Sequence, residues 1–479
     1  MIYKVGAQIR IYNPVPEVIN WAKSDLTMPN PDYEKKQRMG LWLGKTPKTI
    51  QLYETDGDCI VVPYGCEDDV FKFMPGDYYE RHLVNYDFPR TESTSGPIDY
   101  GCKGPMVSVL YDYQWDALRE MKSYTYGILQ APPGSGKTQI GLAYAAETCR
   151  KTLWITHTTD LLNQSRDRAM RYFDKSCIGT ISAGKVNIGS AITFATIQTL
   201  SKLDLLQYRR AWDCIIIDEC HHVAKSPTSV TMYEKVLNNL AAPYKWGLSA
   251  TVHRADGLIK ATYALLGPVR YSIPPEAVAE RTVNATVIPR YTGCGIPADA
   301  LDTDGTIVYT KLITGLTYVE NRNLKILNDL TDNGNYEHYN LILSDRIAHL
   351  EWLMNNLPEK ARTTAVMVTG KMTSKMAKAE RERAIEDMRE GKKHYLFATY
   401  ALAKEGLDIP RLDRLYLASP QKDYAVIAQA IGRIQRVAPE KGEPIAYDYV
   451  DENSKMLRNM YRKRCQTYRK CGCTLKEGQ

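Results

Sequence analysis

Between residues 126 and 150 an apolar stretch, Tyr126–Gln130, leads through a turn rich in proline and glycine into a helical stretch, Thr138–Arg150. Glycines in such a turn let backbone N–H groups converge on one point, and the start of the helix adds partial positive charge there. A strand, turn and helix in this order restrict the segment to an α/β fold with a phosphate-binding loop. The turn reads Ala131-Pro132-Pro133-Gly134-Ser135-Gly136-Lys137-Thr138.

The last residues of this turn indicate a nucleoside triphosphate as the ligand. The amine of Lys137 can reach the β- and γ-phosphates, and the hydroxyl of Thr138 can ligate Mg²⁺. Ala131 stands where the strict pattern has glycine, at a position that mainly sets the turn. The alternative is a glycine turn without a ligand. The loop residues that we expect to bind ATP are Pro133, Gly134, Ser135, Gly136, Lys137 and Thr138.

About eighty residues further on, a predicted strand, Cys214–Asp218, ends in two adjacent acids, Asp218 and Glu219. A carboxylate at the C-terminal end of a parallel strand is well placed beside a phosphate loop. We expect Asp218 to hold Mg²⁺ and Glu219 to orient and polarise the attacking water. His221 and His222 follow, but adjacent histidines point to opposite sides, so we do not expect them to share a metal ion.

From about residue 106 onward, short apolar stretches alternate with longer helical stretches. This alternation predicts parallel, doubly wound sheets. It pauses around residues 270–310, where several prolines and glycines occur, and then resumes, so we expect two such sheets in tandem. The predicted strands are Tyr126–Gln130, Thr152–Thr156, Ala191–Ala195 and Cys214–Asp218 in the first sheet, and Tyr339–Ser344, Thr364–Thr369, His394–Thr399 and Arg414–Ser419 in the second.

The first hundred residues follow a different pattern. Alternating apolar and polar residues in Ile2–Ile11 and Thr49–Tyr53 predict strands, and Val15–Lys23 predicts a short helix. Residues 90–105 are rich in Ser, Thr, Gly and Pro, which is typical of a linker. We therefore expect a separate small α+β domain here. The expected segments are an N-terminal accessory domain for the substrate (1–100), two parallel-sheet domains (106–282 and 290–455) and a basic C-terminal tail (456–479).

The charge of the chain is uneven along its length. The 479 residues include 62 Lys or Arg and 55 Asp or Glu, for a formal net charge of +7. Residues 453–479 alone hold eight Lys or Arg and a single acid, Glu477, whereas acids outnumber bases in residues 1–105. A basic tail can bind the phosphates of nucleic acid through counterion release, or it can be a solvated terminus.

The cysteines and the N-terminus predict a cytoplasmic protein. Eleven scattered cysteines, an odd number, argue against a secreted disulfide framework. The closest group, Cys465, Cys471 and Cys473, lacks an evident fourth ligand, so free thiols are expected rather than zinc. The N-terminus has no secretory signal pattern, and no run of 18 apolar residues predicts a membrane span.

Further motifs occur in a fixed order, and together they resemble the superfamily 2 helicases of the DExH type over about residues 106–455. Tyr113-Gln114 precedes the phosphate loop, as in the adenine-reading element of that family. The other matching segments are Thr156–Thr158, Thr193–Gln198, Gly247–Thr251, Leu343–Arg346, Thr399–Pro410 and Gln429–Arg436.

The resemblance implies two RecA-like domains that hydrolyse ATP between them. Phosphoryl transfer spreads negative charge over the γ-phosphate, and arginines of a second domain stabilise that charge; helix-surface charges are the alternative for these arginines. The implied catalytic residues are Lys137, Glu219, Gln429, Arg433 and Arg436. The further implied ATP contacts are Tyr111, Tyr113, Gln114, Gly406 and Asp408. The implied nucleic-acid contacts are Thr156, His157, Thr196, Gln198, Ser344, Arg346, Thr369, Gly370, Thr399 and Tyr400, and the coupling residues are Ser249, Ala250 and Thr251.

Within the superfamily, the stretches Gly247–Gly257 and Leu265–Tyr271 are similar to the branch that contains XPB and the phage recombination helicase UvsW. That branch usually has arginine where Tyr111 stands, which bears on base specificity. The resemblance implies a monomeric DNA helicase or translocase that remodels branched DNA in recombination or repair, by fork regression or Holliday-junction migration, in the cytoplasm or in that of an infected host bacterium. The alternatives are an RNA helicase, a motor subunit of a restriction or defence complex, and a non-enzymatic scaffold.

Overall fold

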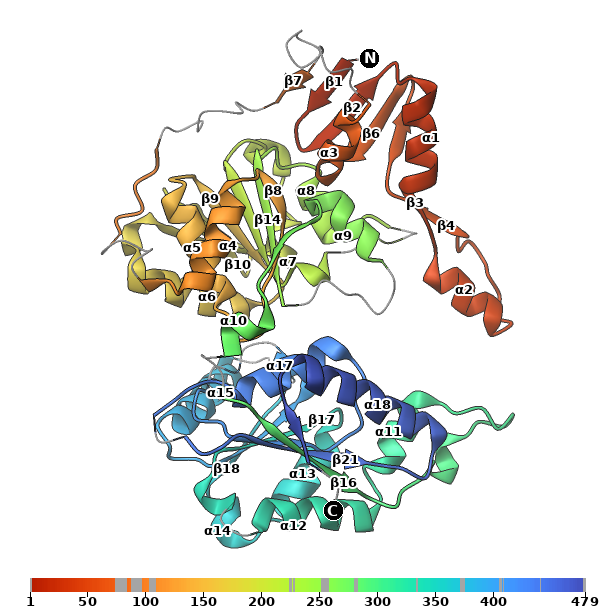
Figure 1. Cartoon of the computed structure of the whole chain (residues 1–479), viewed down its shortest axis with the longest axis vertical. Coiled ribbons are helices and arrows are strands. Elements are labelled where there is room, and N and C mark those ends of the chain that lie inside the picture. The colour runs from red at the N-terminus through yellow and green to blue at the C-terminus, as the bar shows by residue number, and fades with distance from the viewer. Residues whose placement is uncertain are drawn as a thin grey trace. The chain divides into compact units, whose positions relative to one another are not determined.

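In the computed structural model the chain divides into two compact units, Met1–Ile273 and Pro274–Gln479 (Figure 1). Each unit is built around its own large sheet. The structure describes residues 2–73, 84–87, 97–102, 109–223, 226, 229–250, 258–279, 283–332, 335–370, 375–404, 407, 409–439 and 441–476. No helix of these residues is both long and apolar enough to cross a membrane.

The large sheet of the first unit has eight strands in the order β11-β10-β12-β9-β13-β14-β8-β15. All neighbouring pairs are parallel except β10 and β11, which pair antiparallel. The predicted α/β fold with a parallel sheet is confirmed. The strands are β8 (Tyr126–Gln130), β9 (Thr152–Thr156), β10 (Ile178–Ser182), β11 (Lys185–Asn187), β12 (Ile192–Thr196), β13 (Cys214–Asp218), β14 (Tyr244–Ser249) and β15 (Val269–Ser272).

Helices cover both faces of this sheet, because every residue of β9, β12 and β13 is buried and a strand of this kind needs apolar partners on two sides. On one face, α5 approaches so closely that a Cβ at Gly141 would lie 2.7 Å from the Trp154 ring. On the other face, Leu153 and Ile215 pack with the helices that follow β12 and β13. The helices are α4 (Asp112–Lys122), α5 (Lys137–Glu147), α6 (Thr159–Tyr172), α7 (Ile197–Leu200), α8 (Met232–Leu237) and α9 (Ile259–Leu266).

A smaller five-stranded sheet, ordered β5-β6-β2-β1-β7, is formed by the N-terminal residues. Burial alternates along its first two strands, as the period-two sequence pattern predicts for a sheet with one covered face. A separate two-stranded ribbon carries a helix at its end. These elements are β1 (Ile2–Val5), β2 (Gln8–Tyr12), α1 (Pro16–Asp25), β3 (Thr27–Pro29), α2 (Pro31–Arg38), β4 (Thr49–Gln51), β5 (Glu54–Asp56), β6 (Cys59–Pro63), α3 (Glu67–Phe71) and β7 (Val84–Tyr86).

The small sheet shares a hydrophobic core with the large sheet, which differs from the separate domain that the sequence predicts. Tyr126, Ala261 and Ala264 pack in one cluster with the N-terminal core. A Cβ at Gly65 would lie 2.3 Å from the backbone nitrogen of Gly267, so only glycine permits this approach. The hydroxyl of Tyr64 donates to the Pro243 carbonyl oxygen at 2.9 Å. The expected linker, 90–105, lies largely outside the described residues.

The second unit has a seven-stranded sheet in the order β18-β19-β17-β20-β21-β16-β22, with all pairs parallel. One face packs with α15 to α18, and the other with α12 to α14. The strands are β16 (Thr286–Tyr291), β17 (Asn340–Ser344), β18 (Ala365–Val368), β19 (Tyr395–Thr399), β20 (Arg414–Leu417), β21 (Ile445–Val450) and β22 (Thr474–Leu475). The helices are α10 (Pro275–Ala279), α11 (Tyr309–Leu316), α12 (Glu320–Thr331), α13 (Ile347–Asn355), α14 (Glu359–Arg362), α15 (Lys375–Arg389), α16 (Tyr400–Lys404), α17 (Tyr424–Ile434) and α18 (Lys455–Lys470).

The basic C-terminal segment is a folded part of this unit. The alternative that its charge allowed, a solvated terminus, does not hold for α18 and β22. Helix α18 buries Leu457, Met460 and Tyr468, and β22 extends the sheet beside β16. Within the helix, Arg464 forms a buried ion pair with Asp448 at 2.8 Å. The segment folds because its apolar residues recur at helical spacing, a signal that its high charge had masked.

Candidate active site

The phosphate loop lies between β8 and α5, as the sequence predicts. Gly134 and Gly136 have φ angles of +84° and +76°, a backbone conformation that residues with a Cβ rarely adopt. The Ser135 side chain is fully buried, and among the described residues its hydroxyl has no hydrogen-bond partner. A buried hydroxyl inside a glycine-shaped loop fits a site that receives an external acceptor such as a phosphate oxygen.

The start of α4 holds this loop in place. The side-chain amide of Gln114 donates to the Ser135 carbonyl oxygen at 2.8 Å, and the Tyr113 hydroxyl reaches the same oxygen at 3.3 Å. Tyr111 is 43% exposed and stacks on Tyr113, with ring centroids 5.9 Å apart. The expected adenine-reading residues therefore adjoin the loop, and Tyr111 offers an open ring face.

The acid pair lies at the carboxyl end of β13, and the structure brings it to the loop. Glu219 forms an ion pair with Lys137, although the two residues are 82 positions apart in the chain. The carboxylate of Asp218 accepts a hydrogen bond from the Glu219 N–H at 3.0 Å. Thr138, the residue after Lys137, supplies a hydroxyl at the same helix start. A hydroxyl and a carboxylate are oxygen donors of the type that Mg²⁺ prefers.

Burial and charge move the pKa values of the two acids in opposite directions. Burial raises the pKa of Asp218 to about 6, and the charge of Glu219 adds to this rise, while Lys137 opposes it. Burial would also raise the pKa of Glu219, but the charge of Lys137 and the contact with His221 outweigh it, so the pKa of Glu219 is lowered. We infer an ionised Glu219 in this arrangement, because its carboxylate directly contacts the ammonium group.

A histidine connects the acid pair to the end of β14. His221 Nδ1 lies 3.2 Å from a carboxylate oxygen of Glu219 and 3.1 Å from the Ser249 hydroxyl. Ser249 and Ala250 are both buried, and Thr251 lies outside the described residues. Two of the three expected coupling residues are thus placed next to the phosphate site.

A stack of three imidazole rings continues from this histidine. The ring of His222 lies 4.3 Å from that of His157, to which it is parallel within 7°, and 4.3 Å from that of His221, to which it is tilted by 37°. The amide of Gln198 donates to the His157 carbonyl oxygen at 2.6 Å. His157 and Gln198 belong to segments that were expected to contact nucleic acid. The expectation that His221 and His222 point to opposite sides is wrong, because their rings lie side by side. No signal short of the fold could have found the stack, because His157 is 65 positions from His222.

Two other expected nucleic-acid contacts of the first unit are buried. The Thr156 hydroxyl donates to the Thr158 carbonyl oxygen at 3.0 Å, and the Thr196 hydroxyl bonds that of Thr199 at 3.0 Å. These hydroxyl groups hold the turns that follow β9 and β12. Their contact with nucleic acid stays a prediction.

In the second unit, the predicted catalytic residues Gln429 and Arg433 lie on α17, and Arg436 lies just after it. Gln429 is buried, and its side-chain oxygen has no hydrogen-bond partner among the described residues. Arg433 donates to the Ala403 carbonyl oxygen at 3.2 Å. Gly406 and Asp408 lie outside the described residues.

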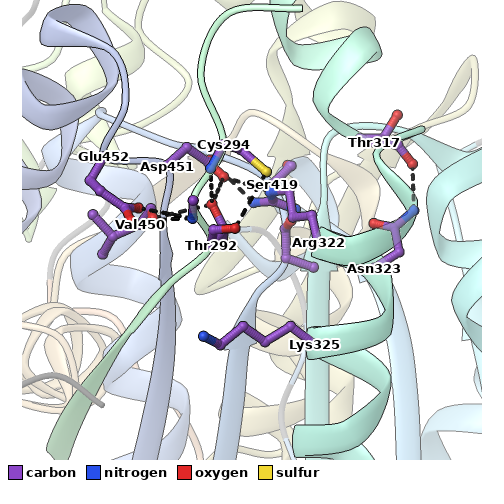
Figure 2. A network of polar contacts seen from close by, with 12 residues as sticks. Thr292, Cys294, Thr317, Arg322, Asn323, Lys325, Ser419, Val450, Asp451 and Glu452 are labelled. Carbon is purple, nitrogen blue, oxygen red and sulfur yellow. Dashed lines mark hydrogen bonds and ion pairs between the residues drawn. The ribbon is translucent and has the colours of Figure 1, made fainter.

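A buried polar network joins α12 to the carboxyl ends of β20 and β21 (Figure 2). Arg322 is fully buried, pairs with Asp451 at 2.8 Å and donates to the Ala418 carbonyl oxygen. Next to it, the Ser419 hydroxyl accepts from the Asp345 N–H at 2.9 Å. Guanidinium, carboxylate and hydroxyl groups are satisfied within one network, which restricts the strand ends to one arrangement.

The expected nucleic-acid contacts of the second unit differ in exposure. Ser344 is fully buried against His349 at 3.0 Å, and Tyr400 is buried with its hydroxyl on the Ser419 carbonyl oxygen. Arg346 bonds Thr314 at 2.8 Å. The remaining ones are Thr369, which is buried, Thr399, which is half-buried, and Gly370, which is exposed.

Two family models match the chain, one in each unit. The model "Type III restriction enzyme, res subunit" matches residues 108–254, and "Helicase conserved C-terminal domain" matches residues 322–438. The first range contains the phosphate loop and the acid pair, and the second contains Gln429, Arg433 and Arg436.

Two curated proteins are similar to the chain over much of its length, and a third is similar over a shorter part. "Putative ATP-dependent RNA helicase L396" of Acanthamoeba polyphaga mimivirus is 26% identical over 436 residues, which are 88% of this chain and 76% of that protein. "Probable helicase D10" of Escherichia phage T5 is 27% identical over 69% of each protein. "DNA 3'-5' translocase XPB2" of Sulfurisphaera tokodaii is 29% identical over 36% of this chain and 38% of that protein.

A solved structure shares the fold at low sequence identity. The DNA-bound "ATP-dependent Type ISP restriction-modification enzyme LlaBIII" matches with a TM-score of 0.54 at 16% identity, over 76% of this chain and 30% of that one. UvsW of phage T4 matches over 100% of this chain and 99% of that one at 19% identity, with a TM-score of 0.41.

The loop and the acid pair therefore lie within the range of the first family model, and Gln429, Arg433 and Arg436 lie within that of the second. A relative of the XPB type is similar to about a third of the chain. The chain belongs to the superfamily 2 helicases, which are ATP-dependent helicases and translocases.

Proposed function

We propose that this helicase acts on DNA, as a translocase that remodels branched DNA such as forks and Holliday junctions. One observation supports the coupling of ATP hydrolysis to movement on nucleic acid. It is the line of contacts from Lys137 through Glu219, His221 and His222 to His157. It joins the phosphate site to a segment that is expected to contact nucleic acid. The relative from Sulfurisphaera tokodaii, whose name describes a DNA translocase, supports DNA as the nucleic acid on which this protein acts.

For hydrolysis, the Lys137–Glu219 ion pair has to open. Lys137 is needed at the phosphates and Glu219 at the attacking water, so ATP binding exchanges their mutual contact for contacts with the substrate. Glu219 then orients the water and accepts its proton. Thr138 and Asp218 would hold Mg²⁺, which neutralises phosphate charge when it is bound.

The other proposed roles follow the matched motifs. Gln114 and Tyr113 position the loop, and the ring of Tyr111 stacks on adenine. Arg433 and Arg436 stabilise the charge that develops on the γ-phosphate. Ser249, through its contact with His221, transmits the state of the phosphate site to the end of β14.

The test is steady-state ATP hydrolysis without nucleic acid and with single-stranded DNA, duplex DNA, a Holliday junction or matched RNA. We expect the strongest stimulation by branched DNA, and a Lys137→Ala variant without turnover as the control. Stimulation by RNA alone would contradict the proposal. It would favour the RNA helicase, which the printed name of the mimivirus relative supports as the second candidate.

A further inference from the structure

Residues 27–51 form a projection from the N-terminal sheet. The helix at the tip of this projection does not pack into a hydrophobic core. The ribbon of β3 and β4 is anchored at its root, where Met28 and Ile50 are buried. Figure 1 shows α2 beyond the end of this ribbon. Helix α2 has no buried residue. A helix that buries nothing adds little to folding by itself, so its retention in a fixed place points to another use.

The tip is nevertheless held by a set of hydrogen bonds. Asn30 caps α2 through the Asp32 N–H at 3.1 Å, and its amide donates to the Pro47 carbonyl oxygen at 2.7 Å. The amine of Lys36 donates to the Thr46 hydroxyl at 2.7 Å. These bonds close the loop between α2 and β4 at both ends, so the loop is a built feature of the fold.

This loop presents a large aromatic ring to solvent. Trp42 is 88% exposed and is the most exposed of the seven tryptophans, with Met39 and Leu41 exposed beside it. Its ring lies over Gly44, where a Cβ would be only 2.9 Å from the ring and where φ is +53°. The glycine thus leaves room for the ring to lie against the loop with one face open.

The surrounding charge is positive, although acids outnumber bases in the N-terminal hundred residues. Residues 31–48 contain five basic and two acidic residues. Lysine is depleted in protein–protein interfaces, whereas exposed aromatic rings among cations are the usual surface for single-stranded nucleic acid. The bases inside a duplex are paired and stacked on both faces, so they cannot cover the open face of a tryptophan. The basic residues of the tip are Lys35, Lys36, Arg38, Lys45 and Lys48.

We propose that the tip of the projection, residues 31–48, is a second nucleic-acid contact of this motor, at which Trp42 stacks on an unpaired base. The lysines and Arg38 bind the flanking phosphates of the same strand. This deepens the proposed function and rests on it, because an unpaired strand beside the motor is what a branched substrate supplies.

Binding of a fluorescein-labelled 20-nucleotide oligothymidylate to the full chain tests the stacking. Loss of one base–aromatic stack lowers affinity by about tenfold, so Trp42→Ala is expected to bind about tenfold more weakly and Trp42→Phe to retain most of the affinity. Tyr318→Ala, at a ring that is 72% exposed in the second unit, is the matched control and is expected to bind as the wild type does. Wild-type affinity of Trp42→Ala would overturn the proposal.

The fluorescence of Trp42 provides a direct readout. The emission of the wild type minus that of Trp42→Phe isolates this residue, and stacking on a base is expected to quench it when unlabelled oligothymidylate is added. An unquenched difference spectrum at saturating oligonucleotide would overturn the proposal. Trp42-dependent self-association in sedimentation, without quenching, would also overturn it and assign the tip to a second copy of the chain.

The phosphate contacts are tested with a separate double variant, and the type of nucleic acid is tested with separate ligands. Lys45→Ala/Lys48→Ala is expected to reduce the salt dependence of oligothymidylate binding by about 1.4 in the slope of log affinity against log salt. An unchanged slope would contradict the proposed contacts of Lys45 and Lys48 with phosphates. Oligouridylate is expected to quench Trp42 as well. A long DNA duplex, in which terminal base pairs are few, is not expected to do so at the same nucleotide concentration, and equal quenching by it would contradict stacking on an unpaired base.

ATP hydrolysis separates this proposal from the function on which it rests. If no nucleic acid stimulates the wild type, the proposed motor on DNA fails, whatever the tip does. If DNA stimulates the wild type and Trp42→Ala equally and both bind equally, only the tip contact fails. The expected result is unchanged basal hydrolysis in Trp42→Ala, with a higher concentration of single-stranded DNA needed for half-maximal stimulation.

Discussion

Glu219 adopts a left-handed backbone conformation, with φ at +53°, that costs a non-glycine residue on the order of 1–3 kcal/mol. The same residue is buried and contacts both Lys137 and His221. The strained turn aims the carboxylate at the phosphate loop instead of along β13. This geometry makes Glu219 the residue at which the chemistry and the histidine stack meet.

Replacement of Glu219 by glutamine keeps the size of the side chain and removes its charge. We expect Glu219→Gln to lower ATP turnover at least about 100-fold, because the proton acceptor is lost. ATP affinity, measured with a fluorescent analogue, is expected to stay the same or rise. The reason is that Lys137 no longer has to break an ion pair with residue 219 before it contacts the phosphates. Collapse of ATP affinity together with turnover would contradict this role.

The second residue-scale prediction concerns His222, the middle ring of the stack. His222→Ala is expected to reduce the stimulation of hydrolysis by DNA by about fivefold or more, with smaller effects on basal hydrolysis. His222→Phe, which keeps an aromatic ring between His221 and His157, is expected to restore much of the stimulation. If alanine and phenylalanine behave alike in the ratio of stimulated to basal rate, stacking does not provide the coupling.

At the scale of elements, the contact between the N-terminal sheet and β14 contains a buried lysine. Lys245 is fully buried, donates to the Ala7 and Leu237 carbonyl oxygens at 3.3 Å, and lies over the Tyr64 ring. Burial lowers the pKa of Lys245 to about 7; the charge of Arg209 lowers it further, and that of Glu67 opposes this.

This pKa makes stability depend on pH in a defined direction. A lysine in the unfolded chain titrates near 10.4, so between about pH 7 and pH 10 the unfolded state binds more protons than the folded state. The free energy of unfolding is therefore expected to rise with pH over this range. Lys245→Met removes the titrating group, and the rise measured by urea unfolding at pH 7 and 9.5 should flatten. An equally steep rise in the variant would assign the dependence to other groups.

At the scale of the whole molecule, the N-terminal residues are part of the first unit and not an appendage. Deletion of residues 1–87 would expose Tyr126, Ala241 and Ala264, which pack against the N-terminal core. At about 25 cal/mol per Å² of apolar surface, such exposure lowers stability by several kcal/mol. We expect the truncated chain to unfold at a lower temperature and to lose basal ATP hydrolysis at 37 °C.

The matched control removes only the tip of the projection. Asn30 and Lys48 are joined by a backbone hydrogen bond of 3.0 Å, so residues 31–47 can be replaced by a two-residue turn. We expect this variant to keep the unfolding temperature and basal hydrolysis of the wild type. If both deletions lost stability equally, the tip would be the stabilising part and not the shared core.

Local sequence patterns were enough to predict the phosphate site and several strands of the two large sheets. Strands β8, β9 and β13 have the predicted bounds because each is a continuous apolar run bounded by turn residues, a signal that lies within five residues. The loop Ala131–Thr138 was equally readable, since its glycines and its lysine act within one turn. Strands β17 to β20 of the second sheet were found in the same way, with ends that shifted by one or two residues, whereas β16, β21 and β22 were not predicted.

The tertiary structure alone decided what lies together across long stretches of chain. The stack of His157 on His222, the burial of Lys245 under the N-terminal sheet and the pairing of Arg322 with Asp451 each join residues more than sixty positions apart. Their contacts depend on strand order and sheet packing, which local patterns do not encode. For the same reason the exposure of Trp42 was unreadable, because an apolar residue in a sequence looks alike whether the fold covers it or leaves it to a partner.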